Sequence, residues 1–177
     1  MTVRSSSPFI WGPYSCAGAG TSIATFSIDQ GHKAWMLHGY GIRERGREAV
    51  TPFLDWVFVL NRGVSYGLLP EAGQWLLTTF AIVAALAMWV WLARAGTGNL
   101  MAISLGFIIG GALGNAVDRV LYGGVVDYVS LHAFGFYWYV FNIADAAIVA
   151  GVCGLLYESF LSSRGRIDAS KTAQDGR

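Results

Sequence analysis

The stretch NLMAISLGFIIGGALGNAV, residues 99–117, decides the fold, because it is mainly apolar and no charge occurs from residue 95 to residue 117. A helix needs about 20 mainly apolar residues to cross the hydrocarbon core of a bilayer. Three further segments, near residues 9–28, 73–93 and 137–157, have a similar length and few or no charges. The first of these is the least apolar, since it is rich in Gly, Ser, Thr and Ala. The sequence therefore predicts a mainly α integral membrane protein with four transmembrane helices.

The overall composition agrees with a membrane protein. Of the 177 residues, 54% are hydrophobic and only 13% are charged, which is typical of membrane proteins rather than soluble domains. The formal net charge of +1 and the lack of a basic patch argue against nucleic acid as a partner. The positive charges divide equally between the two sides of the predicted spans, so charge alone does not orient the protein in the membrane.

Residues 29–72 form the only long polar connection between predicted spans. Within it, the apolar runs WVFVL (56–60) and VSYGLL (64–69) flank an NRG turn, which predicts a short hairpin. We expect a small extracytoplasmic β-sheet subdomain here, between the first and second helices, and a solvated loop at GIRERGRE (41–48). The single membrane domain is then residues 1–161, and residues 162–177 are a polar cytoplasmic tail that frays.

Small residues recur at four-residue intervals in the last two spans. Gly106, Gly110 and Gly114 do so in the third span, and the fourth offers a second set: Ala146, Ala150 and Gly154. Such rows let helix backbones approach closely in lipid. We interpret both as packing seams that hold the third and fourth helices together.

Two aspartates stand out in this apolar region. Asp145 lies inside the fourth predicted span, and Asp127 lies just before it. An ionisable group at membrane depth costs several kcal/mol and usually persists only where function needs it. Two neighbouring carboxylates can share a proton and divide acid and base work between them. The pair Asp127 and Asp145 therefore suggests aspartic protease chemistry.

Other polar residues are expected beside these carboxylates. Asn115, Asp118 and Arg119 share a face at the end of the third helix, and Asn142 shares a face with Asp145 on the fourth. The two asparagines are either helix-packing groups or substrate-orienting amides. Arg119 either binds a lipid phosphate or braces the site, and we prefer the second. Asp118 next to Arg119 is interpreted as a structural ion pair or a helix-end group.

The sequence is also compatible with other functional classes. No HExxH or CxxC motif predicts a zinc site, and the aspartate spacing matches no compact magnesium motif, so we expect neither metal nor cofactor. A small proton-coupled transporter that uses Asp145 as its proton carrier is the main alternative. The absence of an internal repeat argues against it. A structural membrane subunit is a third possibility and predicts that both aspartates tolerate substitution.

Five blocks, in order along the chain, resemble those of the bacterial lipoprotein signal peptidases, or signal peptidase II. They are DQGHK (29–33), NRGVSYGLL (61–69), GGALGNAVDR (110–119), GGVVDYV (123–129) and FNIAD (141–145). The resemblance implies that Asp127 and Asp145 are the catalytic dyad. It also implies supporting or substrate-binding roles for seven residues: Asp29, Lys33, Asn61, Gly63, Asn115, Arg119 and Asn142.

The resemblance also implies the reaction and its location. The substrate would be a prolipoprotein whose cysteine carries a diacylglyceryl group, cut just before that cysteine by direct water attack. The active site would lie near the outer face of the bacterial cytoplasmic (inner) membrane, with both termini in the cytoplasm. We expect a monomer whose partners are its lipid-modified substrates and membrane lipids. This sequence departs from the family pattern at His32, where Ser or Thr is common, and at Tyr66, where Phe is usual.

Overall fold

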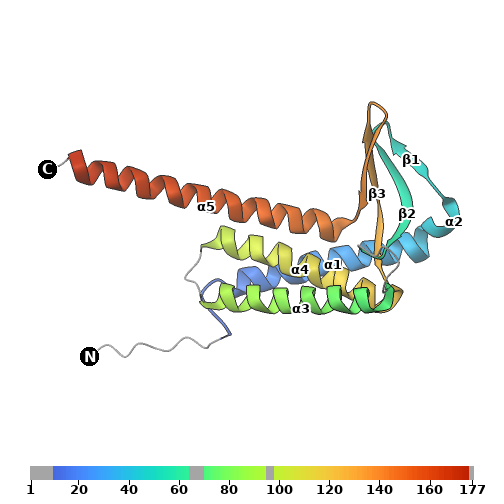
Figure 1. The fold of residues 1–177 in the computed structure, drawn as a ribbon, viewed down its shortest axis with the longest axis horizontal. Helices are drawn as coiled ribbons and strands as arrows, with labels where there is room; N and C mark the ends of the chain where they lie inside the picture. Colours follow the sequence, from blue (N-terminus) through green and yellow to red (C-terminus); the bar gives the residue numbers. More distant parts are fainter. Residues whose placement is uncertain (1–9, 64–69, 95–97, 176–177) are drawn as a thin grey trace.

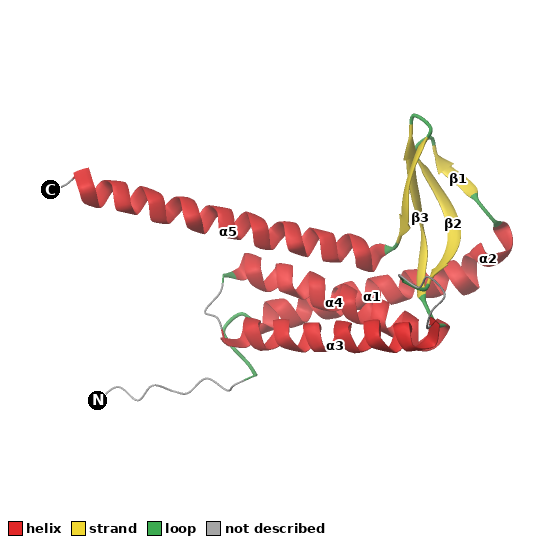
Figure 2. Ribbon diagram, viewed as in Figure 1, coloured by secondary structure: helices red, strands yellow, loops and turns green. Residues whose placement is uncertain are grey.

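The computed structural model describes residues 10–63, 70–94 and 98–175. Four long helices form a bundle with a small sheet at one end (Figure 1): α1 (Ser15–Ala34), α3 (Pro70–Arg94), α4 (Asn99–Tyr122) and α5 (Ile143–Asp175). The strands run across the direction of the helices and extend past α5 (Figure 2). The bundle therefore has a helical body and a sheet-bearing end.

Three of these helices are long and apolar enough to cross a membrane. By length and composition they are Gly73–Arg94, Asn99–Tyr122 and Ile143–Arg164, among the residues that the structure describes. The helix α1 is not one of them, and it begins at Ser15, about six residues after the start of the predicted first span. Its small and polar residues explain the low hydropathy, since Asp29 and Lys33 lie on it. A mainly helical membrane protein is thus confirmed in its coarse outline.

The prediction for the last span was wrong at its start. The helix α5 begins at Ile143, and the residues before it form the strand β4 (Phe136–Phe141). The apolar run that looked like one span is a strand followed by a helix. At the other end, α5 continues to Asp175, so the frayed tail that we expected is helical.

The helix α4 forms the centre of the bundle and packs against α1, α5 and α3. Of the apolar stretch that suits a membrane span, 56% is buried in α4, against 22% in α3 and 17% in α5. The residues of α4 therefore contact each of the other three long helices, whereas α3 and α5 present most of their surface outward.

The glycine seams only partly connect the helices that we predicted, since Gly154 of α5 packs against Ser104 of α4 as expected, whereas the Gly106 row does not face α5. A Cβ atom at Gly106 would lie 2.6 Å from the Gly18 carbonyl oxygen, so this row faces α1 rather than α5. The contact with α5 instead uses Gly111, where a Cβ atom would lie 2.5 Å from the Ala144 carbonyl oxygen. Ala146 and Ala150 are exposed and belong to no seam. Close packing therefore joins α4 to α1 through one face and to α5 through another.

The sheet has four antiparallel strands in the order β1-β2-β3-β4. The strands β1 (Glu48–Thr51) and β2 (Leu54–Asn61) come from the connection after α1, whereas β3 (Val125–Ala133) and β4 come from the connection between α4 and α5. The location that we predicted, between the first two helices, is therefore half correct. The expected partner strand at 64–69 lies outside the described residues, and β2 pairs with β1 and β3.

A small apolar core attaches this sheet to the end of α1. After α1 the chain continues as a π-helix, η1 (Trp35–Tyr40), and a short helix, α2 (Ile42–Arg45). Met36 and Ile42 pack with Val126 and Tyr128 of β3, and all four are buried. The segment predicted as a solvated loop is thus partly anchored, and this core fixes β3, which carries Asp127.

Candidate active site

Asp127 lies on β3, opposite Val59 of β2, and is 1% exposed. Its two carboxylate oxygens accept hydrogen bonds from two different elements. The Asn61 side-chain amide donates to Oδ2 at 3.0 Å, and the Asn142 side-chain amide donates to Oδ1 at 2.6 Å. Because both oxygens are held, the carboxyl group has one fixed orientation.

Asp145 lies in the first turn of α5, where it forms a capping box with Asn142. The Asp145 backbone N–H donates to Asn142 Oδ1 at 3.0 Å, and the Asn142 backbone N–H donates to Asp145 Oδ2 at 3.3 Å. Such reciprocal bonds satisfy amides that a helix start leaves free, and a helix N-terminus also favours a negative charge. Asp145 thus lies at a helix end, not in mid-span as its apolar surroundings suggested.

Asn142 connects the two aspartates. It is fully buried, and its side-chain amide donates both to Asp127 and to Asn115 Oδ1, the latter at 3.2 Å. Asn115 in turn donates to Asp145 Oδ1 at 2.8 Å. The two carboxylates are therefore joined by two asparagines, as the shared-site interpretation of the sequence required.

The surroundings of Asp127 favour its protonated form. Burial raises the pKa of Asp127 from the usual 3.8 to about 6, the Asn61 hydrogen bond opposes this, and the negative charge of Asp145 adds to it. A carboxyl group that keeps its proton near pH 6 can act as an acid beside an ionised partner. The pair is thus equipped for general acid and base catalysis.

A buried ionic network around Lys33 supports this arrangement. The Lys33 ammonium group contacts Asp29 at 2.8 Å, Asp118 at 2.7 Å and Asn115 Oδ1 at 3.2 Å. Its three donors are all used, and both aspartates are fully buried. Because Asn115 also binds Asp145, Lys33 fixes an amide that contacts the dyad.

The two aspartates of this network also hold backbone groups next to Asp127 and Asp145. Asp29 Oδ1 accepts the Ala144 backbone N–H at 2.9 Å, and Asp118 Oδ2 accepts the Val126 backbone N–H at 3.0 Å. Ala144 precedes Asp145, and Val126 precedes Asp127. One ionic network therefore positions both chain segments that carry the dyad.

Our expectation for Asp118 was partly wrong. Its ion-pair partner is Lys33 rather than Arg119, because the side chain points between α1 and β3. Arg119 donates to the Asn115 carbonyl oxygen at 3.1 Å and interacts electrostatically with Asp118, Asp127 and Asp145. This position supports the bracing role that we preferred.

Asn61 and Gly63 form the turn after β2. The Gly63 backbone N–H donates to Asn61 Oδ1 at 2.9 Å, which leaves the Asn61 amide free to bind Asp127. Gly63 has a φ of +75°, and a Cβ atom there would lie 2.7 Å from the Leu77 side chain of α3. The backbone conformation therefore favours glycine at this position.

Sequence reasoning missed Gln30. Its side-chain amide donates to Asp118 Oδ1 at 2.9 Å and to the Gly114 carbonyl oxygen at 3.1 Å, so it seals the network between α1 and α4. The signal was its place beside Asp29 in the DQGHK block. In the part of the chain that the structure describes, no group of three or more His, Cys, Asp or Glu side chains has the geometry to hold a metal ion.

The blocks that form this site match those of a known family. A family model described as Signal peptidase (SPase) II matches residues 21–161, which include every residue of this site. The chain belongs to the signal peptidase II family. It is therefore a membrane peptidase, and this family membership excludes the transporter and structural-subunit alternatives.

Named relatives and solved structures agree with this family. The lipoprotein signal peptidase of Methylobacterium sp. (strain 4-46) is 51% identical over 156 residues, which cover 86% of this chain and 93% of that protein. The lipoprotein signal peptidase of Methylocella silvestris is 46% identical over 162 residues, or 90% and 94% of the two chains. A solved bacterial membrane enzyme is 25% identical with a TM-score of 0.71, covering 84% of this chain and 90% of that one.

Proposed function

We propose that this peptidase removes the signal peptides of diacylglyceryl-modified prolipoproteins, with Asp127 and Asp145 as its two catalytic carboxylates. One observation carries the assignment. Asn142 binds Asp127 through its side chain and Asp145 through a capping box, and thereby holds both carboxylates at one end of the bundle. Aspartic catalysis requires two carboxyl groups that act on one water molecule and one peptide bond.

In the proposed reaction a water oxygen attacks the scissile carbonyl carbon while an ionised aspartate takes one proton from the water. The other aspartate, protonated, donates its proton to the carbonyl oxygen. The first aspartate then donates the water proton to the nitrogen of the lipidated cysteine as the C–N bond breaks, and one hydroxyl proton of the tetrahedral species returns to the second aspartate. The scheme assigns the acid and base roles to the pair rather than to one residue.

The asparagines hold the catalytic groups in this proposal rather than the substrate. The Asn142 amide donates to Asn115, Val126 and Asp127, so its two hydrogens are already shared among protein acceptors. This arrangement favours the positioning role among the alternatives that the sequence left open for Asn142 and Asn115.

We further propose that the protein lies in the bacterial cytoplasmic membrane, with the sheet and the dyad at the outer face and both termini in the cytoplasm. Asp127 lies on β3 and Asp145 in the first turn of α5, next to the sheet, and the helical body extends away from the sheet (Figure 1). We also propose that the active form is a monomer.

The function is tested with purified protein and a prolipoprotein, with and without its diacylglyceryl group. The expected result is one cut before the cysteine of the lipidated substrate, identified by the mass of the released signal peptide, and little cutting of the unlipidated form. Equal cutting of both forms would contradict the lipid requirement. No cutting of either would contradict the function.

A further inference from the structure

A hydrogen-bonded pair of ring side chains links α1 to the strand that carries Asp127. His32 lies on α1 directly before Lys33, and Tyr128 lies on β3 directly after Asp127. The Tyr128 hydroxyl oxygen and His32 Nδ1 are 3.0 Å apart, and the two rings stack with their centroids 5.0 Å apart. This contact between α1 and β3 does not involve the Lys33 ammonium group.

The surroundings of the pair fix both rings. The His32 imidazole lies 5.4 Å from the Trp35 ring and 6.5 Å from the Trp56 ring, measured between centroids. Tyr128 is 0% exposed and packs with Met36 in the small apolar core of the sheet. Side chains in a close-packed core have little freedom to move. The pair therefore holds one defined position.

The Tyr128 hydroxyl also binds the first residue of α5. A helix leaves its first backbone N–H groups without partners inside the helix. In α5 the side chains of Asp29, Asn142 and Asp145 satisfy three of these groups. The Ile143 backbone N–H donates to the Tyr128 hydroxyl oxygen instead. The hydroxyl hydrogen is thus available for the lone pair of the nearby imidazole nitrogen.

Tyr128 thereby joins the two chain segments that carry Asp127 and Asp145. It follows Asp127 directly, and Ile143 precedes Asp145 by two residues. Successive side chains of a strand point to opposite faces, so the Tyr128 ring enters the core while the Asp127 carboxylate faces the site. A displacement of about 1 Å in a catalytic group can lower a rate on the order of 100-fold. A contact that fixes both segments can therefore affect the reaction without touching the substrate.

We propose that His32 and Tyr128 are positioning residues that set the separation of Asp127 and Asp145. His32 Nδ1 accepts the hydroxyl hydrogen and orients Tyr128, which holds the strand of one carboxylate against the helix of the other. The inference rests on the proposed function of these two aspartates. His32 is also a position at which this chain departs from the family pattern, and the Ser or Thr common there has no ring to stack on Tyr128.

The first test removes the hydroxyl alone. Tyr128→Phe keeps the ring and its packing, and with a lipidated prolipoprotein it should lower kcat on the order of 10-fold while KM changes less than about 2-fold. The matched control is Tyr137→Phe. Tyr137 also lies 5.0 Å from a histidine ring, that of His132, but it is 58% exposed on β4. This variant should keep the wild-type kcat.

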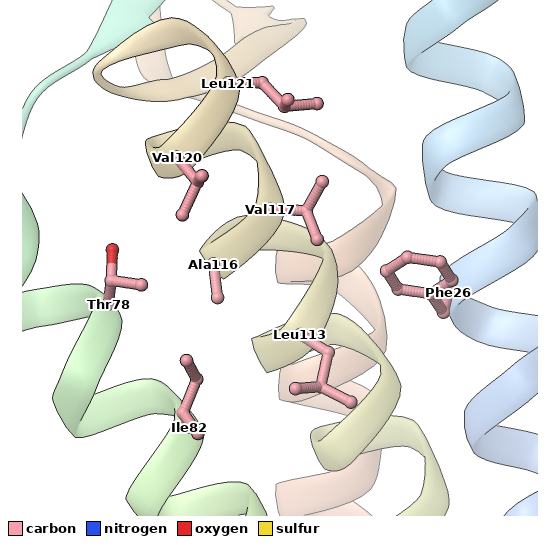
Figure 3. A pocket seen from close by; sticks show the side chains of 8 residues that line it. All are labelled: Phe26, Thr78, Ile82, Leu113, Ala116, Val117, Val120 and Leu121. Carbon is pink, nitrogen blue, oxygen red and sulfur yellow. The ribbon is translucent and has the colours of Figure 1, made fainter.

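A second control removes a buried hydroxyl that holds nothing. Thr78 is 4% exposed and lines an apolar cavity of about 460 Å³ between α1, α3 and α4 (Figure 3). Its hydroxyl has no hydrogen-bond partner among the described residues. Thr78→Val should therefore keep kcat. An equal loss of kcat in Thr78→Val and Tyr128→Phe would contradict a specific role for the Tyr128 hydroxyl.

The second test separates the hydrogen bond of His32 from its ring contact. His32→Asn keeps an acceptor bonded to Cγ, as Nδ1 is, whereas His32→Phe keeps a ring and has no acceptor. We expect kcat within about 2-fold of wild type for His32→Asn and a loss on the order of 10-fold for His32→Phe. Combining His32→Phe with Tyr128→Phe should lose no more than either change alone, because both remove the same bond.

Thermal melts establish that each variant is folded, and if Tyr128→Phe does not fold, the comparison of His32→Asn with His32→Phe decides. Wild-type kcat in folded Tyr128→Phe, or a loss in His32→Asn but not in His32→Phe, would overturn the inference. So would losses that multiply in the double variant. A raised KM at unchanged kcat would assign His32 to substrate binding instead. Failure of the proposed function is distinct, because wild type would then cleave no lipidated prolipoprotein.

Discussion

At the scale of single residues, the stability of the fold should depend on the protonation of Asp127. Its pKa is raised to about 6 in the folded protein, so the folded state holds this proton more tightly than the unfolded chain does. Stability from this group is therefore present at low pH and is lost as pH rises from about 4 to about 6. The expected loss is on the order of 3 kcal/mol.

The comparison of wild type with Asp127→Asn measures this loss. The Tm difference, wild type minus variant, should fall between pH 4 and pH 7 in thermal melts in detergent. Curves that run parallel across this range would show that the carboxyl group is not desolvated as the structure indicates.

The second residue-scale prediction concerns Lys33. Lys33→Met would leave Asp29 and Asp118 buried without their cation, at a cost of about 3 to 5 kcal/mol. We expect a large drop in Tm and a loss of activity through the Asn115 contact. Arg45→Met is the control, because the pair of Arg45 with Glu48 is largely exposed and should contribute little. Equal Tm values for the two variants would contradict a central role for the buried network.

At the scale of elements, the seam between α1 and α4 sets the position of that network. A Cβ atom at Gly110 would lie 2.5 Å from the Ser22 carbonyl oxygen, so Gly110→Ala should force the helices apart and cost about 1 to 3 kcal/mol. Gly20→Ala meets no atom within 4 Å, and alanine is the better helix former, so it should leave Tm unchanged or raise it. Thermal melts of both variants test this prediction. A Gly110→Ala protein that is as stable and as active as wild type would contradict it.

The elements also show what the sequence could and could not predict. The spans at 73–93 and 99–117 were predictable, because a long apolar run without charge is seldom compatible with anything but a membrane-spanning helix. The start of α5 was not, because FYWYVF is as apolar as the helix after it and its length fits either a strand or a helix. The sheet was half predicted for the same reason, since β3 and β4 look like part of a membrane span.

The site was predictable where motifs carried it and unpredictable where distant pairing decided it. The blocks around Asp127 and Asp145 indicated both carboxylates. The partner of Asp118 was missed, because Lys33 is on another helix far away in the sequence and Arg119 is the adjacent residue. The role of Asn142 as a helix cap depended on knowing that α5 starts at Ile143.

At the scale of the whole molecule, the proposed orientation can be read from cysteine labelling in cells. In a variant without Cys16 and Cys153, a cysteine at Phe134 in the exposed turn between β3 and β4 should react with a membrane-impermeant maleimide in intact spheroplasts. A cysteine at Ser163, exposed toward the other end of α5, should react only after permeabilisation. The reverse pattern would place the dyad at the cytoplasmic face.

The account depends most on the claim that Asp127 and Asp145 together activate water. The direct measurement is cleavage of a lipidated prolipoprotein by wild type, Asp127→Asn and Asp145→Asn, with Asp55→Asn as an acidic control in the sheet. We predict that both dyad variants melt as folded proteins and lose at least about 1,000-fold in kcat, in keeping with the loss of an essential acid or base, whereas Asp55→Asn keeps most of its activity. Cleavage near the wild-type rate by either folded dyad variant would contradict the account.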